Sequence, residues 1–480
     1  MTEATTKPTT TEPDSPGGGS TVARNLTLLL AVVCAVQFLD AMDIASMGPA
    51  LPLVQKDLKM SPSILQWVVS AYALGFGGFL LLGGRLADLF DRKKLLIGWL
   101  IVFVVASCAG GLAQDGLQLV IARLIKGVSA GFTAPAAMAI LLNAFREEKA
   151  RNKALGTFLA IVSAGYSLGL LLGGLLATVN WRLILFLPAA AGLLVAGIAT
   201  VAVPAGNKST GNGRLDVLGS ITVTGSAMAL VYGLSRAAGS GWGDTWTIAS
   251  LVAAAVLFPL FLLVERRHPE PLVPLSIFSR PQLVRANLCM LFFGAYVAFQ
   301  FVLTLYYQDV LKWSPLEAGL AFLLGGVLTA GTARYGAALV TKYGAWPVAT
   351  VGLVMLSAGY IGWALLIGHV AAVVPMLVQQ VLGGFGFAAV YPALNIAAVG
   401  SAAENEQGLA SGLFNAGAQI GNGIVVAVVA AVFALNTGGT LGAYRVGLWT
   451  ITGITVAVTL LAIGGTLRQR RLAAGAVAAA

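Results

Sequence analysis

The sequence predicts an all-α protein that crosses a membrane many times, and its composition and hydropathy carry that prediction. Of its 480 residues, 58% are hydrophobic and only 10% are charged, whereas a soluble domain carries about 25% charged residues. The mean hydropathy is +0.87, and the apolar residues continue in runs of about 20, the length a helix needs to span a bilayer core. A β-barrel is excluded, because its strands are alternating segments of about ten residues.

Fourteen apolar runs, bounded by charged residues, Pro and Gly, are expected to be the spanning helices. They lie at 25–52, 63–84, 94–113, 117–143, 152–177 and 182–203, then at 215–235 and 245–264, and finally at 286–310, 316–341, 346–367, 370–399, 408–434 and 444–467. The chain is therefore divided into a disordered cytoplasmic tail (1–24), a six-helix bundle (25–205), two inserted helices (206–265), a cytoplasmic linker (266–285), a second six-helix bundle (286–467) and a cytoplasmic tail (468–480).

The basic residues predict the orientation. Of the 29 Lys and Arg residues, 20 fall on the side of the N-terminus, and six fall on the other side: Lys56, Lys59, Arg182, Arg236, Lys312 and Arg445. Because short cytoplasmic loops carry the excess of Lys and Arg, both termini are expected in the cytoplasm and the protein in the cell (inner) membrane. The same placement in short loops argues against a nucleic-acid partner, despite a net charge of +10.

An internal repeat relates the two six-helix bundles. The segment Gln55–Pro62 reads Gln-Lys-Asp-Leu-Lys-Met-Ser-Pro, and Gln308–Pro315 reads Gln-Asp-Val-Leu-Lys-Trp-Ser-Pro. Each links the first and second run of its bundle. Two parallel repeats predict a pseudo-two-fold axis along the membrane normal, a solute site between the halves, and transport by rocking of one half on the other.

Four ionisable side chains fall inside apolar runs of the first bundle. Asp40 and Asp43 lie three residues apart in the first run, and Arg123 and Lys126 have the same spacing in the fourth. Residues three apart share a helix face, and two carboxylates that close, away from bulk water, do not both ionise easily. The acids and bases lie at overlapping depths, so we expect one or two acid–base pairs and a role in proton coupling. A purely structural ion pair between the two helices is the alternative.

The second bundle offers uncharged polar residues in place of the buried charges. Gln380 and Gly383 stand where the first bundle has Arg123 and Lys126. Residues expected to contact substrate are Gln300, Tyr306, Tyr391, Asn395, Asn415, Gln419 and Asn422. The last three form one helical stripe, which would equally suit bonding between neighbouring helices. Phe299, Phe301, Tyr307 and Tyr391 are aromatic candidates for lining an apolar cavity.

Two further patterns predict moving parts. Glycines recur in the fifth run at Gly165, Gly169, Gly173 and Gly174. Small residues four apart let helices approach closely, so we expect a packed interface that slides. Between the second and third runs, Gly84, Asp88 and Arg92 are expected to take part in gating, with Asp88 capping the helix that follows.

The loop Gly83–Lys94 resembles the most specific motif of the major facilitator superfamily, Gly-x-Leu-Ala-Asp-Arg-x-Gly-Arg-Lys. It departs from the motif at Leu89, where the family has a basic residue, and at Asp91, where it has glycine. We expect Asp91 to keep the turn, because Asp tolerates the left-handed conformation. The chain is similar in particular to the fourteen-span drug:proton antiporter family, and the resemblance covers 25–467.

Three more motifs support this resemblance. Asp43 with Ala50-Leu51-Pro52 matches the family's Asp-x-x-x-x-x-x-Ala-Leu-Pro, which makes Asp43 the counterpart and Asp40 an addition. Arg123 and Gly127 match Arg-x-x-Gln-Gly, with Lys126 replacing glutamine, and the resemblance implies a role for Arg123 in proton relay. The glycine run resembles the antiporter motif Gly-Pro-x-x-Gly-Gly, with leucine in place of proline.

Together these patterns favour a proton-coupled secondary transporter that exports amphipathic small molecules, such as drugs or antibiotics, as a monomer in the lipid bilayer. The alternative is a proton-coupled transporter of one dedicated substrate, anionic or lipid-like, moving in either direction and drawn in by Lys126. An enzyme is not expected, because the sequence has no nucleophile–base arrangement. No cofactor and no metal site are expected, because the three cysteines lie apart in apolar runs.

Overall fold

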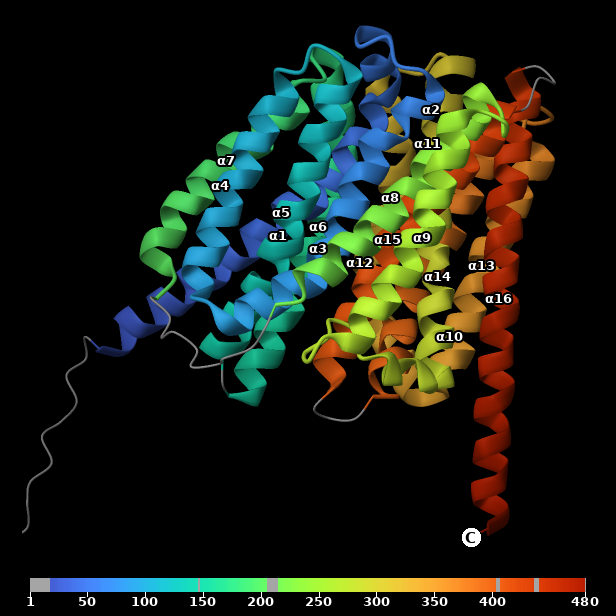
Figure 1. The fold of residues 1–480 in the computed structure, drawn as a ribbon. Coiled ribbons are helices and arrows are strands. Elements are labelled where there is room, and N and C mark those ends of the chain that lie inside the picture. The colour runs from blue at the N-terminus through green and yellow to red at the C-terminus, as the bar shows by residue number, and fades with distance from the viewer. Residues whose placement is uncertain (1–17, 146, 205–214, 403–405, 436–439, 480) are drawn as a thin grey trace, which may run out of the picture.

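The computed structural model describes residues 18–145, 147–204, 215–402, 406–435 and 440–479, and every regular element in these ranges is a helix (Figure 1). The first half holds α1 (Gly18–Asp57), the short α2 (Pro62–Leu65), α3 (Trp67–Leu89), α4 (Arg92–Gly111), α5 (Gly116–Ala144), α6 (Glu148–Val179) and α7 (Leu183–Ala202). The inserted pair is α8 (Val217–Ser240) and α9 (Thr245–Arg267). The second half holds η1 (Leu275–Ser279), α10 (Pro281–Cys289), α11 (Leu291–Leu305), η2 (Tyr306–Val310), α12 (Pro315–Tyr343), α13 (Ala345–Leu366), α14 (Val373–Val399), α15 (Gln407–Leu435) and α16 (Thr440–Ala479).

The helices agree with the predicted spans, with differences at their ends. Thirteen helices of the described chain are long and apolar enough to cross a membrane. The remaining predicted span corresponds to α6, in which the apolar helical segment Ala164–Val179 is shorter than the length required of a span. The predicted run 286–310 is broken after Cys289 and ends in the π-helical turn η2, a local widening that is often found at functional sites.

The two predicted tails and the linker before α8 are only partly described. Residues 1–17 lie outside the described residues, and α1 already begins at Gly18, inside the predicted disordered tail. Residues 205–214, at the start of the predicted inserted segment 206–265, lie outside them as well. At the other end, α16 continues as a helix through the predicted tail to Ala479, because the Ala- and Arg-rich segment after the span has high helix propensity.

The helix packing confirms the internal repeat. In the first half, α3 packs on α5, α4 packs on α5 and α7, and α1 packs on α6 and α7. The second half repeats this pattern, with α12 on α14, α13 on α14 and α16, and α11 on α15 and α16. The same set of pairings in two segments of similar sequence is the pseudo-two-fold arrangement that the repeat predicts.

The two halves meet along two seams. One is formed by α6 and α12, and the other by α3 and α15. At the end away from the termini, the halves also share one buried apolar cluster, to which α1 contributes Met47, Ala50, Leu51 and Val54. Gln308 Nε2 of η2 donates to the Pro49 carbonyl of α1 at 2.6 Å at the same end.

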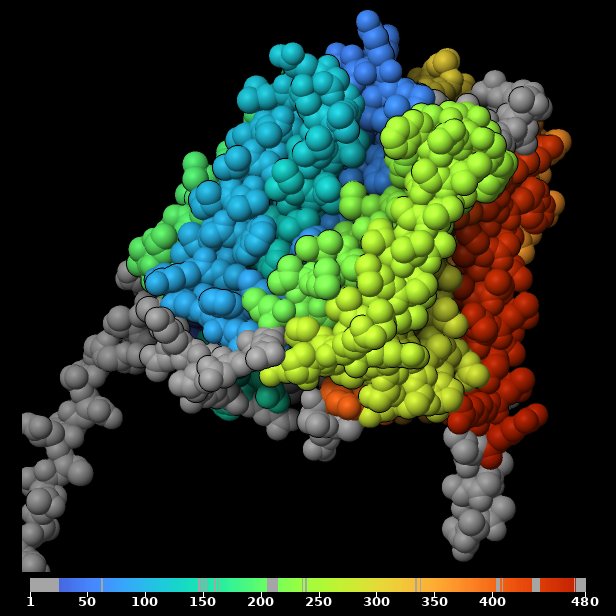
Figure 2. Space-filling view, viewed as in Figure 1, coloured from blue at the N-terminus to red at the C-terminus, as the bar shows by residue number. Residues whose placement is uncertain are grey.

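The inserted pair lies on the α3–α15 seam. Helix α8 packs on both α3 and α15, and α9 packs on α8. Figure 2 shows this green to yellow-green pair across the front of the molecule, beside the blue first half. Two adjacent glycines of α3 make the approach possible: a Cβ on Gly77 would lie 2.8 Å from the Ala416 carbonyl of α15, and one on Gly78 would overlap the Thr224 side chain of α8.

Candidate functional site

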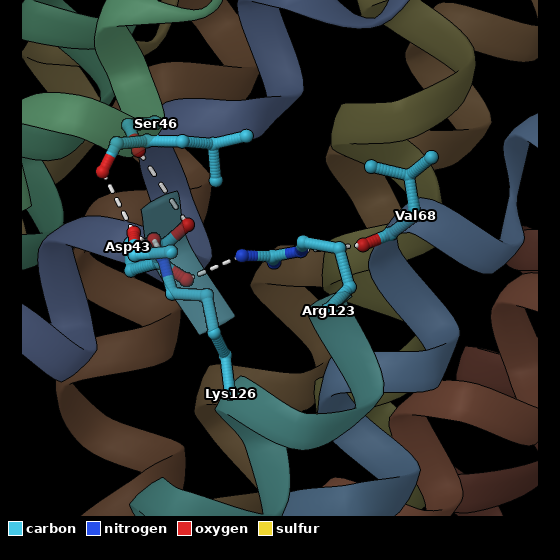
Figure 3. Close-up of polar contacts among 7 residues, drawn as sticks. Asp43, Ser46, Val68, Arg123 and Lys126 are labelled. Atoms are coloured by element: carbon cyan, nitrogen blue, oxygen red, sulfur yellow. Dashed lines mark hydrogen bonds and ion pairs between the residues drawn. The ribbon is translucent and has the colours of Figure 1, made fainter. Parts of the chain in front are cut away.

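A buried ion cluster lies in the first half, where α1 faces α5 (Figure 3). Asp43 of α1 is 0% exposed, and each of its two carboxylate oxygens accepts from a different cation: Arg123 Nη1 donates to Oδ2 and Lys126 Nζ donates to Oδ1. The spacing of three residues places both cations on the same face of α5. The structure therefore brings together three of the four charged residues that the sequence singled out.

The Arg123 guanidinium is held by α3 as well as by Asp43. Its Nε donates to the Val68 carbonyl at 2.8 Å (Figure 3), and its Cζ lies 4.6 Å from the centroid of the Tyr72 ring. A cation over an aromatic face gains electrostatic energy that replaces part of its lost hydration. Tyr72 was not found from the sequence, because nothing distinguishes a tyrosine inside an apolar run from a packing residue.

Lys126 has its own set of contacts on α4. Its Nζ donates to Ser107 Oγ at 2.7 Å and lies 4.5 Å from the centroid of the Phe103 ring. Ser107 Oγ in turn donates to the Leu185 carbonyl of α7 at 2.7 Å, which leaves its lone pairs facing the ammonium. A buried ammonium is tolerated only when its donors are matched in this way. Ser107 also went unnoticed in the sequence.

Asp40 lies one turn before Asp43 on α1 and belongs to the same region without contacting either cation directly in the described residues. Its Oδ2 accepts from Gln37 Nε2 at 3.0 Å and from Thr133 Oγ1 of α5 at 3.4 Å. The side chain is buried but keeps 6% exposure. The two carboxylates that share one helix face thus have different partners: two cations for Asp43, and two neutral donors for Asp40.

The glycine stripe of α6 packs directly on α1. A Cβ added at Gly165, Gly169 or Gly173 would meet the backbone of α1. At Gly169 it would lie 2.7 Å from the Met42 carbonyl oxygen. Gly174 faces the other way, where an added Cβ would lie 2.5 Å from the Pro315 carbonyl at the start of α12. The stripe therefore sets the position of the α1 segment that carries Asp43 and also contributes to the seam between the halves.

In the second half, an amide and a tyrosine from adjacent helices are joined. Tyr391 Oη of α14 donates to Asn415 Oδ1 of α15 at 2.7 Å, and Asn415 Nδ2 donates to the Ser411 carbonyl at 2.9 Å. Gln300 of α11 accepts from Tyr166 Oη of α6 at 2.6 Å, a bond that crosses between the halves.

Half-buried aromatic rings surround these amides. The Tyr296 and Phe387 centroids are 4.8 Å apart, and Phe387 stacks on Tyr391 at 5.9 Å. We call this group the aromatic–amide cluster; its members are Phe293, Tyr296, Gln300, Phe387, Tyr391 and Asn415. Sequence reasoning identified only Gln300, Tyr391 and Asn415 in it, because the apolar pattern of α11 and α14 does not show which aromatic rings face inward.

Other candidates of the second half lie elsewhere. Tyr306 is 4% exposed and packs edge-on against Trp363 and Tyr444, so it belongs to the packing between helices. Three aromatic residues that were expected to line an apolar cavity are buried in the core: Phe299, Phe301 and Tyr307. The aromatic positions that remain half-buried are those of the aromatic–amide cluster.

The polar stripe of α15 divides between neighbours. Asn415 faces α14, whereas Gln419 lies against Gly77 of α3. Asn422 is buried, and its Oδ1 has no hydrogen-bond partner in the part of the chain that the structure describes. Asn395 of α14 is half-buried. In the described residues, no group of His, Cys, Asp and Glu side chains is able to hold a metal ion.

Comparison with known proteins identifies the family of the chain. Residues 33–424 match the family model described as Major Facilitator Superfamily. The chain belongs to the major facilitator superfamily. It is therefore a multi-pass membrane transporter by family, and the predicted resemblance to this superfamily and its drug:proton antiporters is confirmed.

Two relatives and one solved structure illustrate the likeness. The chain is 35% identical over 419 residues to the puromycin resistance protein pur8 of Streptomyces alboniger, covering 86% of this chain and 82% of the relative. It is 32% identical over 428 residues to the cephamycin export protein CmcT of Amycolatopsis lactamdurans, covering 88% of each. A crystal structure of a peptide transporter POT in complex with sulfate superposes with a TM-score of 0.71 over 92% of this chain and 95% of the other, at 16% identity, which supports the fold alone.

The loop that carries the superfamily's motif differs from the sequence expectation at its cap. Asp91, not Asp88, is the N-cap of α4: its side chain accepts from the backbone N–H of Lys93 at 2.9 Å and of Lys94 at 3.2 Å. Its φ of −62° is ordinary, so the expected left-handed turn does not form. Asp88 is exposed and pairs with Arg92 at 3.8 Å, and Gly84 is open on its Cβ side up to Pro135 at 4.0 Å. The aspartate that replaces the family's glycine thus supplies a cap.

Replacing Asp91 with alanine is expected to lower the free energy of unfolding by about 1 kcal/mol, because two backbone N–H groups lose their acceptor. Asp88→Ala is the matched control, with an expected change below about 0.5 kcal/mol, since it removes only an exposed ion pair. Thermal unfolding of both variants in detergent measures the difference. Equal losses for the two variants would contradict the assignment of the cap.

Proposed function

We propose that this protein is a proton-coupled transporter that exports amphipathic small molecules by alternating access, with both termini in the cytoplasm. The observation that carries this proposal is the buried cluster of Asp43, Arg123 and Lys126 inside a membrane-spanning bundle. Ionisable groups within spans are costly and are retained chiefly for ion or proton pathways. The names of the relatives, an antibiotic resistance protein and an antibiotic export protein, support drug-like compounds as the substrate class.

The second half supports the proposed division of labour. The aromatic–amide cluster offers half-buried ring faces and neutral amides, which suit an amphipathic solute better than a strongly charged one. Proton chemistry would then lie in the first half and solute contact mainly in the second. Gln300, Tyr391 and Asn415 are the proposed contacts, with Asn395 and Gln419 as half-buried neighbours.

The coupling follows from charge. Binding or release of one proton in the buried cluster changes its net charge by one, and this change alters the relative stability of the two conformations. The halves are joined at the end away from the termini by the shared apolar cluster and by the bond from Gln308 to Pro49. With cytoplasmic termini, this corresponds to a transporter closed toward the outside, and the α6 glycines would form the sliding surface as the halves rock.

The dedicated-substrate alternative rested on Lys126 as an attractor for an anionic substrate. In the structure Lys126 is 0% exposed and its ammonium is occupied by Asp43 and Ser107. An anionic solute would have to displace a carboxylate that is already in contact with this cation, so the exporter of amphipathic, neutral or cationic compounds is the better supported function.

The test is uptake of a cationic dye into proteoliposomes that are acidic inside. The native protein should accumulate dye in exchange for outgoing protons, and Asp43→Asn should not, because two buried cations lose their carboxylate. Asp57→Asn is the matched control: Asp57 lies on the same helix but its side chain is 46% exposed beside Arg182. Native protein that moves no dye, yet transports an anionic solute along the pH gradient, would overturn the proposal in favour of the alternative.

A further inference from the structure

We infer that Asp40, and not Asp43, is the carboxylate that takes up and releases the coupled proton, and that Asp43 is a positioning residue that stays ionised. This inference rests on the proposed proton coupling and deepens it. The family motif in the sequence directs attention to Asp43, because Asp40 lies outside that motif. The contacts of the two carboxylates instead favour Asp40 as the group that binds the proton.

Asp43 is the counter-charge of two buried cations. Arg123 occupies one carboxylate oxygen and Lys126 the other, and all three side chains are at most 1% exposed. A proton on either oxygen would neutralise the carboxylate and leave both cations buried without their counter-charge. Losing one partner of a buried pair is strongly unfavourable. Asp43 therefore remains the fixed anion that holds the two cations in the bilayer.

Asp40 can change its protonation state without breaking any ion pair. Its two hydrogen-bond donors in the described chain, Gln37 and Thr133, are both neutral. The titratable or charged groups that act on it electrostatically are Asp43 on its own helix, Lys126 on α5 and Tyr72 on α3. In the described residues, none of these three groups forms a hydrogen bond or an ion pair with Asp40.

The charge balance of the four residues makes this proton exchangeable. With Asp40, Asp43, Arg123 and Lys126 all ionised, these four residues together have no net charge, and a proton bound to an Asp40 oxygen raises their net charge to one positive. When that O–H bond breaks, the proton goes to water and the four residues are neutral again. The four residues therefore repel a substrate cation when Asp40 is protonated, and carry no net charge against it when Asp40 is deprotonated.

The position of Asp40 gives the proton an exit. Asp40 lies one helical turn nearer the termini than Asp43 and retains 6% exposure, whereas Asp43 has none. Gln37, its hydrogen-bond donor, lies a further turn in the same direction and is only half-buried. In a structure whose halves are joined at the opposite end, release toward the termini is the open direction.

Dye transport tests the coupling role. In proteoliposomes that are acidic inside, Asp40→Asn should reduce gradient-driven dye accumulation to the level of protein-free vesicles. Dye counterflow, which exchanges dye for dye and needs no proton release, should stay above that level and thereby show that the variant is folded. Asp40→Glu should recover gradient-driven accumulation. Accumulation by Asp40→Asn equal to that of the native protein would overturn the inference.

Infrared difference spectra between acid and alkaline pH identify the protonating group without any substrate. Several carboxylic acids contribute C=O bands to such spectra; one of these bands should be present in the native protein, missing in Asp40→Asn and shifted in Asp40→Glu. That band should be unshifted in Asp43→Glu. A set of bands that is unchanged in Asp40→Asn, or that loses or shifts a band in Asp43→Glu, would overturn the inference even if native dye transport supports the proposed function. Failure of native dye transport would instead count against the proposed function, while the spectra still decide between the two carboxylates.

Discussion

Replacing Arg123 with methionine is expected to lower the free energy of unfolding by about 3 kcal/mol. Removing one partner of a buried ion pair typically costs about 3–5 kcal/mol, and the lower end applies here because Lys126 still contacts the other oxygen of Asp43. Methionine keeps the apolar stem and the contact with the Tyr72 ring, so the loss reports mainly the charge. Thermal or denaturant unfolding of the purified protein in detergent measures it.

Two further variants separate the charge effect from loss of packing. In Arg123→Met with Asp43→Asn, the remaining Lys126 and Asp40 balance each other, so the double variant should be less destabilised than the sum of the two single changes. Arg85→Met is the matched surface control, because its ion pair with Glu270 has side chains 40% and 39% exposed; its effect should stay below about 1 kcal/mol. Equal destabilisation by Arg123→Met and Arg85→Met would contradict the buried cluster.

Replacing Gly173 with alanine is expected to destabilise the protein by about 1–3 kcal/mol, the usual cost of forcing extra atoms into packed contact. A Cβ at this position would collide with the backbone of Ser46 on α1, and backbone cannot rotate out of the way as a side chain can. Since Asp43 lies one turn away on the same segment of α1, gradient-driven dye transport should fall as well.

Gly156→Ala provides the matched control on the same helix. Gly156 is exposed, and an added Cβ there meets nothing within 4 Å. Alanine at an open helix position is neutral or stabilising by up to about 1 kcal/mol. Gly156→Ala should therefore raise the unfolding temperature or leave it unchanged, and it should not lower the transport rate. Gly173→Ala should lower both. Similar losses for both would show that the α1–α6 contact does not limit stability.

Much of the fold could be predicted from the sequence, because a bilayer permits few solutions. The length of the apolar runs determined where helices form, and the Gln-x-x-Leu-Lys-x-Ser-Pro repeat indicated two similar halves. Both signals come from the residues themselves. They did not show the break at Met290 or the helical continuation of α16 to Ala479, because neither of these two features depends on hydropathy.

The sequence by itself also indicated four charged residues that are buried: Asp40, Asp43, Arg123 and Lys126 stand in apolar runs, and their spacing of three places each pair on one helix face. Only the tertiary structure decided how they pair. Both cations contact Asp43, whereas Asp40 is left with Gln37 and Thr133. In the second half it likewise decided that Phe293, Tyr296 and Phe387 surround Tyr391, whereas Tyr306 packs against Trp363. The physical reason is that helical periodicity gives the face of a helix but not the neighbour that the face meets, and that neighbour determines which carboxylate is free to bind a proton.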